Sequence, residues 1–334
     1  MTFSSTQLSN AFAIAHKYIE KNAPILFEME HPLLKKILER KEYAEGERLQ
    51  FPVNFNQMSN IGYISGTTAD VLNSNTQQNL TYGELNWKMF VEDFSVTLEE
   101  LVKASGTNAV VDIVTAKSEN TVESFRNFLH AGFFGSAATD PLAVNGLLDI
   151  FAASGTSYAG LLNTDFGNDQ AGDNLWLPLI STSVNYPSYS NVSQFITKIK
   201  AKSASAIDYI ISTPAIFQRY KDLQQASGQR YVGETGLKSG FDSIMIDGVP
   251  FIPDAFCQGT GGATTDSYLY GISSSTMGLK YKYGWDKPSP MDDKGLNLPN
   301  QPVMFSKKMY AANVFCNNRR LNFVLKTLSP TASS

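Results

Sequence analysis

Two stretches in the first third of the chain alternate apolar and polar residues, which is the pattern of half-buried strands. The first runs from Leu49 to Phe55 and the second from Leu85 to Val91, with the odd-numbered residues of each on the apolar face. The residues between them, Asn56 to Glu84, are mostly polar or glycine. A loop beyond about 12–15 residues in a compact domain usually has a function. We therefore expect a long β-hairpin whose apolar residues another chain covers, and the alternative is a disordered surface loop.

A long helical pattern follows the hairpin. The segment Thr97-Leu-Glu-Glu100 is a capping box that opens a short helix. Apolar residues at helical spacing, among them Phe128, then predict a helix over 107–133. At 1.5 Å per residue this helix measures about 40 Å, far more than the average helix of a globular domain. We expect Glu123 and Arg126 to pair on its exposed side.

Shorter patterns precede and follow these elements. Amphipathic helices are predicted around 8–19 and from Pro32 onward. From Asp140 the pattern is mixed α/β and contains no internal repeat. The elements predicted there are a helix around 192–199, a strand around 207–211, a helix from Pro214 that Thr213 caps and Gly228 ends, a hairpin turn at Asp247-Gly248, a strand at 268–272 and a β-rich end over 310–328.

Composition narrows the range of functions. The chain has 334 residues, with 27 Lys and Arg against 31 Asp and Glu, a net charge of −4, 43% hydrophobic residues and only 17% charged residues. The hydrophobic content supports a folded core, and the lack of a basic excess argues against a basic nucleic-acid reader. No apolar run reaches the roughly 18 residues of a membrane span, and no signal peptide is evident. We expect no membrane partner.

Residues that carry catalysis or bind metals are scarce. The two cysteines, Cys257 and Cys316, form no CxxC pair, so we expect no zinc site, no disulfide and no cofactor. The segment Gly155-Thr-Ser-Tyr-Ala159 lacks the second glycine of a nucleophile elbow. Three histidines are expected at the surface or as helix caps: His16, His31 and His130. An enzyme is therefore not expected.

The small net charge conceals an uneven distribution. Residues 49–106 hold two bases against six acids, whereas residues 294–334 hold six bases and no acid. Chance clustering on solvated faces is the simplest explanation. The functional explanations are an acidic loop that lies on basic strands of a neighbouring copy, or a basic patch that faces the phosphates of DNA. In both, Arg319 and Arg320 are expected to make contacts.

Four segments follow one another in a recognisable order. They are Ala137–Leu148, Ser243–Asp254 with its Asp-Gly-Val-Pro, Tyr268–Ile272, and Ala312–Leu325 with its Asn-Arg-Arg. Together with the N-terminal arm, the hairpin and the long helix, this series resembles the major capsid protein of tailed double-stranded-DNA bacteriophages, which has the Hong Kong ninety-seven-like fold. The resemblance covers nearly the whole chain in element order, and its motifs are individually loose.

The resemblance implies an α+β fold in five parts. These are an N-terminal arm (1–48), an extended β-hairpin loop (49–96), a peripheral domain (97–149) with a spine helix at about 107–135, an axial domain (150–240), and β-strands that return to the peripheral domain (241–334). The implied function is a structural virion protein that self-assembles as hexamers and pentamers into an icosahedral capsid around packaged double-stranded DNA. Implied partners are neighbouring capsomers, DNA bound without sequence specificity, and portal, scaffolding or decoration proteins, with assembly in the host bacterial cytoplasm.

We expect contacts between subunits at the hairpin and at the basic C-terminal part, from Ile61, Tyr63, Ile64, Asp70, Leu72, Glu84, Trp87, Arg319 and Arg320. Covalent cross-linking of subunits is not expected, because 56–86 contains no lysine and the nearest, Lys88, lies on the hairpin stem. Two alternatives stay open. One is an encapsulin-like nanocompartment shell with the same fold, and the other is a small soluble hydrolase or sugar-binding module.

Overall fold

The computed structural model describes residues 32–55, 79–97, 99–100, 107–153, 155–168, 172–182, 188–203, 207–226, 244–257, 267–284, 296–297 and 303–328. The predicted helix around 8–19, the apolar loop residues between 56 and 78, and the helix end at Gly228 lie outside the described residues. The elements of the described chain are α2 (Pro32–Glu39), β1 (Lys41–Ala44), β2 (Leu49–Asn54), β3 (Leu80–Leu85), β4 (Lys88–Thr97), α4 (Thr107–Phe133), α5 (Leu147–Ile150), η1 (Asn163–Asp165), β5 (Leu179–Ser181), α6 (Tyr189–Lys202), β6 (Tyr209–Ser212), α7 (Pro214–Ala226), β7 (Ile244–Ile246), β8 (Val249–Pro253), β9 (Ser267–Ile272), β10 (Met277–Lys282), β11 (Leu296–Asn297), β12 (Val303–Cys316), η2 (Arg319–Leu321) and β13 (Phe323–Leu328).

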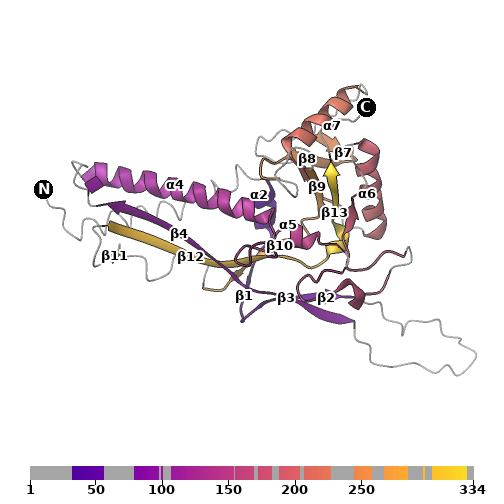
Figure 1. Ribbon diagram of the computed structural model, residues 1–334, viewed down its shortest axis with the longest axis horizontal. Helices are drawn as coiled ribbons and strands as arrows, with labels where there is room; N and C mark the ends of the chain where they lie inside the picture. The colour runs from indigo at the N-terminus through magenta and orange to yellow at the C-terminus, as the bar shows by residue number, and fades with distance from the viewer. Residues whose placement is uncertain are drawn as a thin grey trace, which may run out of the picture.

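Two sheets and a separate hairpin organise these elements (Figure 1). One sheet has the order β1-β10-β12-β11, with β4 also paired to β12, and the other has the order β5-β13-β9-β6-β8-β7. The long strands β4 and β12 form a ribbon that runs beside α4, and the three extend together away from the rest of the subunit. Helices α6 and α7 lie against the six-stranded sheet, and the β2–β3 hairpin projects from the other end.

Helix α4 spans Thr107–Phe133, which confirms the predicted length. The predicted apolar side is buried only in part. Leu129 is buried and Phe125 packs against the core, but Phe128 is 64% exposed, and Ser118, Val122 and Arg126 are buried. The Glu123–Arg126 ion pair forms at 3.5 Å, with the Arg126 side chain buried rather than on the exposed side.

The capping box before α4 forms and is tied to that helix. The Thr97 backbone N–H donates to Glu100 Oε2 at 3.0 Å, and Lys117 Nζ of α4 lies 2.6 Å from the same oxygen. Lys117, and then Thr97, lower the pKa of Glu100 to about 2. Because the pKa is lower in the folded state, the contribution of this carboxylate to stability is present above about pH 4.5 and is lost as the pH falls toward 2.

The second predicted alternating run changes phase partway. Leu85 is buried as predicted, but Met89 and Val91 are 67% and 56% exposed, and Phe90 and Phe94 occupy the buried face instead. The reason is a break between β3 and β4, after which the strand restarts with the opposite phase. As a result, β2 pairs with β3 in the register Leu49↔Leu85, and β4 pairs with β12.

The C-terminal strands do not return to one sheet as a block. Strands β10, β11 and β12 join the sheet beside α4, whereas β7, β8, β9 and β13 join the six-stranded sheet with β5 and β6. The chain changes sheets at η2, between β12 and β13. The predicted boundary at 240 is therefore wrong, because the six-stranded sheet collects strands from both sides of it.

The turn and cap predictions for this region are confirmed. Asp247 and Gly248 have φ of 51° and 82°, the positive values that a tight hairpin turn needs. Thr213 Oγ1 accepts from the Ile216 backbone N–H at 3.4 Å and so caps α7.

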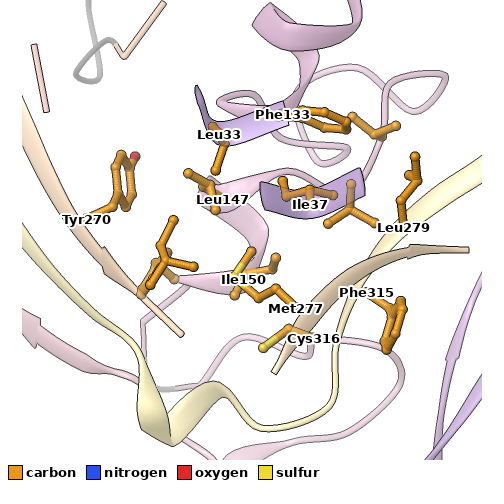
Figure 2. Packing of buried hydrophobic residues seen from close by; sticks show 14 of the residues in the cluster. Leu33, Ile37, Phe133, Leu147, Ile150, Tyr270, Met277, Leu279, Phe315 and Cys316 are labelled. Atoms are coloured by element: carbon orange, nitrogen blue, oxygen red, sulfur yellow. The ribbon is translucent and has the colours of Figure 1, made fainter. Parts of the chain in front are cut away.

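One hydrophobic core joins the parts of the subunit (Figure 2). It gathers side chains from both sheets, and the labelled ones come from the helices α2, α4 and α5 and the strands β9, β10 and β12: Leu33, Ile37, Phe133, Leu147, Ile150, Tyr270, Met277, Leu279, Phe315 and Cys316. Leu33 and Ile37 come from α2, and β1 pairs in parallel with β10. Residues 32–44 therefore belong to the body of the subunit, which corrects the predicted arm over 1–48. A second core lies between the six-stranded sheet and helices α6 and α7.

No helix in the described part of the chain is long and apolar enough to cross a membrane.

Candidate functional site

The β2–β3 hairpin is anchored to the body through its buried face. Leu49, Phe51 and Val53 point inward, and the Phe51 ring packs on Phe315 of β12 with centroids 5.8 Å apart. Gly83 lies opposite Phe51, and a Cβ at position 83 would come within 2.5 Å of that ring. Glycine at this position therefore lets the ring lie against the partner strand.

Glu84, predicted to contact another subunit, has partners within its own chain. Its carboxylate accepts from Gln50 Nε2 at 2.7 Å and pairs with Arg48 Nη1 at 3.2 Å. Its backbone N–H donates to the Ala159 carbonyl at 2.8 Å. These bonds hold the hairpin base, and a contact of Glu84 with a neighbouring chain stays a prediction.

Trp87 and Lys280 add two further anchors. Trp87 Nε1 donates to the Gly46 carbonyl at 3.1 Å, and Lys280 Nζ donates to the Gln50 carbonyl at 3.2 Å. Bonds on both sides of the hairpin limit its rotation as a rigid body. The direction in which the hairpin projects is therefore set by the folded subunit itself.

The outer face of the hairpin is exposed and partly apolar. Pro52 lies opposite Tyr82, and Asn54 lies opposite Leu80. Tyr82 is 56% exposed and Leu80 is 44% exposed. This face leads into 56–78, which holds the predicted contact residues that lie outside the described residues: Ile61, Tyr63, Ile64, Asp70 and Leu72.

The acidic and basic segments identified in the sequence meet within one subunit. In the β4–β12 ribbon, Glu92 lies opposite Lys308 and Asp93 lies opposite Lys307. Glu92 and Lys308 are only 7% and 4% exposed, and Tyr310 Oη donates to Glu92 Oε2 at 3.3 Å. Opposite charges on directly facing residues favour this pairing. Part of the charge asymmetry therefore serves folding of the subunit rather than contact with a neighbour.

Burial raises the pKa of Glu92, while Lys308 and Tyr310 oppose that rise. Because the pKa is raised above the usual 4.5, the contribution of this carboxyl group to stability falls as the pH rises through the native-state pKa. Glu92 and Lys308 thus form a specific contact between β4 and β12. Burial disfavours the charged form of Glu92, so this contact has a desolvation cost.

Replacing both Glu92 and Lys308 with leucine is expected to leave the free energy of unfolding unchanged or to raise it by up to about 4 kcal/mol, because neither charge then loses its hydration. Replacing Glu92 alone leaves Lys308 buried without this carboxylate and should lower that free energy by about 3–5 kcal/mol. Denaturant unfolding of the wild type and the two variants at pH 7 measures both changes. A double variant less stable than the single one would contradict the interpretation.

Arg319 lies inside the subunit, which corrects its predicted place on a contact surface. The residue is 0% exposed, and its guanidinium donates to the carbonyls of Ile150 at 2.6 Å and Ala152 at 2.9 Å. The rings of Tyr158 and Trp176 lie 5.1 and 5.8 Å from its Cζ. Arg319 therefore binds the carbonyl groups at the end of α5, and it offers no charge to a neighbour or to DNA.

Replacing Arg319 with methionine is expected to lower the free energy of unfolding by about 2–4 kcal/mol, because two buried carbonyls lose their donor. Arg320→Met is the matched control, since the neighbouring arginine is half-buried and the change should stay within about 0.5 kcal/mol. Thermal and denaturant unfolding of the two variants measure the loss of stability in each. Equal losses would show that the buried position of Arg319 is not what matters.

Arg320 lines a groove of about 650 Å³ at the hairpin root. The walls come from β2, from the loop before β5, from the turn between β9 and β10 and from the turn after β12: Pro52, Val53, Asn54, Phe55, Phe166, Leu175, Trp176, Ser275, Thr276, Asn317, Asn318, Arg320 and Leu321. We call this the root groove. Of the nine predicted contact residues, the structure places Arg320 here and Glu84 and Trp87 at the hairpin base.

The sequence did not predict a buried pair of side chains, His130 and Asp254. His130 is 0% exposed, so the prediction that it lies at the surface or caps a helix is wrong. Its Nε2 lies 2.8 Å from Oδ2 of Asp254, directly after β8, and the rings of Phe134 and Phe256 pack edge-on against the imidazole. The two partners are 124 positions apart, and no local pattern links them. Among the described residues, no third ligand completes a metal site.

No protein-family model matches the sequence, and no curated protein matches it. A subunit of the cyanophage A-1(L) capsid superposes with a TM-score of 0.65 at 14% identity, over 90% of this chain and 93% of that chain. The capsid of a native GTA particle gives 0.58 at 10% identity, over 89% and 90%. The holo-SrpI encapsulin complex from Synechococcus elongatus PCC 7942 gives 0.55 at 13% identity, over 90% and 89%.

At these identities the likeness shows the fold alone. The chain has the α+β fold that these shell subunits share, which confirms the predicted Hong Kong ninety-seven-like fold.

Proposed function

We propose that this chain is the major capsid protein of a tailed double-stranded-DNA bacteriophage, a structural protein of the virion. In this function it assembles as hexamers and pentamers into an icosahedral shell around packaged DNA. One observation carries the proposal: capsid subunits of a cyanophage and of a GTA particle share the fold over about nine tenths of both chains. Portal, scaffolding or decoration proteins, and assembly in the host cytoplasm, belong to the same proposal.

The hairpin supports this function on physical grounds. Its base is held by a hydrogen bond to the Ala159 carbonyl and one from Lys280, while Leu80 and Tyr82 leave apolar surface exposed on the projecting part. A projecting hairpin can bond a neighbour through main-chain groups of its strands, and such bonds tolerate the varied angles of a closed shell. Many such contacts, each weak alone, hold an assembly together in sum.

A second candidate function is an encapsulin-like shell that encloses proteins rather than a genome. The match to the encapsulin complex, which covers 90% of this chain, favours it. The two candidates share the fold and the assembly and differ in the contents of the particle.

Negative-stain electron microscopy of the purified protein tests assembly. We expect closed, uniform shells, and a chain that stays monomeric at high concentration would contradict both shell functions. Particles from the natural source, treated with nuclease and then opened, distinguish the contents. Protected double-stranded DNA supports the capsid, and enclosed protein without DNA supports the encapsulin-like shell.

A further inference from the structure

One buried cation in the subunit has no charged partner. Arg319 is 0% exposed, and no carboxylate among the described residues pairs with its guanidinium. An arginine keeps its positive charge in proteins, and buried charges are normally paired. Its Nε and Nη2 groups donate to the carbonyls of Ile150 and Ala152, but its Nη1 has no hydrogen-bond partner in the described part of the chain. The guanidinium therefore lacks both a counter-charge and an acceptor at Nη1.

The titratable side chains around Arg319 do not supply the missing negative charge. Burial raises the pKa of the Tyr158 hydroxyl well above its usual value and raises the pKa of the Cys316 thiol to about 11, so both groups are neutral at pH 7. The carboxylate of Asp149, on α5, accepts instead from the backbone N–H of Ala137, in the turn after α4. A counter-charge for Arg319 therefore has to come from outside this group of side chains.

A second donor without an acceptor lies in the same cluster. Trp176 is 1% exposed, and its indole Nε1 has no hydrogen-bond partner among the residues that the structure describes. The Cζ atom of Arg319 lies 5.8 Å from the centre of the Trp176 ring. Trp176 also forms part of the wall of the root groove, and none of the described residues that line this groove is acidic. The two donors therefore lie beside a groove that does not repel anions.

We propose that Arg319 Nη1 and Trp176 Nε1 bind a small monovalent anion of the size of chloride. One negative charge balances the guanidinium, and both donors gain an acceptor in a charge-assisted hydrogen bond. Arg319 begins η2, where the chain passes from one sheet to the other, and Trp176 belongs to the loop before β5. The anion thus joins two segments that are far apart in the sequence and stabilises the junction between the sheets. This binding site is independent of the proposed shell function.

Denaturant unfolding in different salts tests the site. Chloride replaces gluconate at pH 7 and constant ionic strength, so the general screening of charges stays the same. Because only the folded chain has the site, each tenfold rise in chloride above its dissociation constant should raise the ratio of folded to unfolded protein about tenfold. An equal ratio in chloride and in gluconate would overturn the proposal.

Two tryptophan variants locate the site. Trp176→Phe keeps an aromatic ring but removes the Nε1 donor, and it should weaken chloride binding at least about tenfold, as expected for the loss of a hydrogen bond to a charged group. Trp87→Phe is the matched control, because Trp87 Nε1 donates to the Gly46 carbonyl, and it should leave the chloride dependence unchanged. The same chloride dependence in Trp176→Phe as in the wild type would overturn the assignment.

Bromide gives a measurement that needs no unfolding. A bromide ion beside the Trp176 indole quenches its fluorescence, so replacing gluconate with bromide should cause a saturable loss of emission from the folded protein. Trp176→Phe should remove the saturable part, and Trp87→Phe should keep it. Quenching that only rises in proportion to bromide, as in collisions with exposed tryptophans, would overturn the proposal. Folded protein gives this result whether or not it assembles, so the test is separate from that of the shell function.

A carboxylate of the chain itself is the other source of a monovalent negative charge. Asp169 precedes Trp176 in the sequence and lies outside the described residues. If its side chain pairs with Arg319, the wild type does not respond to chloride, and Asp169→Asn lowers the ratio of folded to unfolded protein in gluconate and makes it depend on chloride. That result would overturn an external anion. A chloride response in the wild type that Asp169→Asn leaves unchanged supports it.

Discussion

Deleting residues 60–77 is expected to give a folded subunit that makes no closed shells. The deletion removes the loop residues proposed to contact a neighbour and keeps all of β2 and β3. It ends before Asn79, because the Asn79 carbonyl accepts the Phe55 N–H at 3.0 Å and closes the ladder. The anchors at Ala159 and Lys280 also remain, so the roughly fourfold shorter loop should raise the free energy of unfolding by only about 1.2 kcal/mol.

Two measurements and one control check this result. Circular dichroism and thermal melting establish that the deleted chain is folded, and electron microscopy with size-exclusion chromatography scores assembly. A control of unchanged length replaces 60–77 with glycine and serine, and it should also fail if the side chains, rather than the reach of the loop, make the contact. Shells of normal size from the deletion variant would refute the role of the loop.

Local patterns predicted elements well where the structure depends on neighbouring residues. The alternation of Leu49, Phe51 and Val53 matches their buried face, and the helix over 107–133 has the predicted length. Periodicity placed the buried face of that helix only in part. Phe128 is apolar and exposed while Arg126 is charged and buried, because the face is also set by tertiary packing on β4 and on the distant strand β12, whose Tyr310 stacks on Phe125.

Pairing between strands that are far apart in the sequence explains the other differences between the predicted and the observed structure. The β3–β4 break reverses the phase at Met89, and only pairing with β12 makes the reversed phase favourable. The same pairing brings Glu92 against Lys308, so a charge contrast that suggested contact between subunits is partly used within one. Arg319 and Arg320 are adjacent and chemically identical, and only the position of the α5 end decides which one is buried.

A large loss of stability from one side chain is also expected for His130→Ala. We expect the free energy of unfolding to fall by about 3–5 kcal/mol, because Asp254 stays buried without this partner. The packing of Phe134 and Phe256 against the ring is lost as well. Denaturant unfolding measures the change. Asp254→Asn keeps an oxygen that can accept the Phe256 N–H and should therefore cost less than His130→Ala.

A double-mutant cycle determines whether the two side chains act as a pair. The double variant His130→Ala with Asp254→Ala should lose less free energy of unfolding than the sum of the two single losses, by about 1–3 kcal/mol. As a control, His130→Ala is combined with Ile199→Ala in the other core, and these two losses should add within about 0.5 kcal/mol. Additive changes at His130 and Asp254 would show that the pair is not coupled.

Because His130 belongs to α4 and Asp254 follows β8 of the six-stranded sheet, breaking the pair should raise hydrogen exchange in both segments together while α6 stays protected. Exchange that rises in α4 alone would mean that the pair stabilises the helix end without joining α4 to the six-stranded sheet.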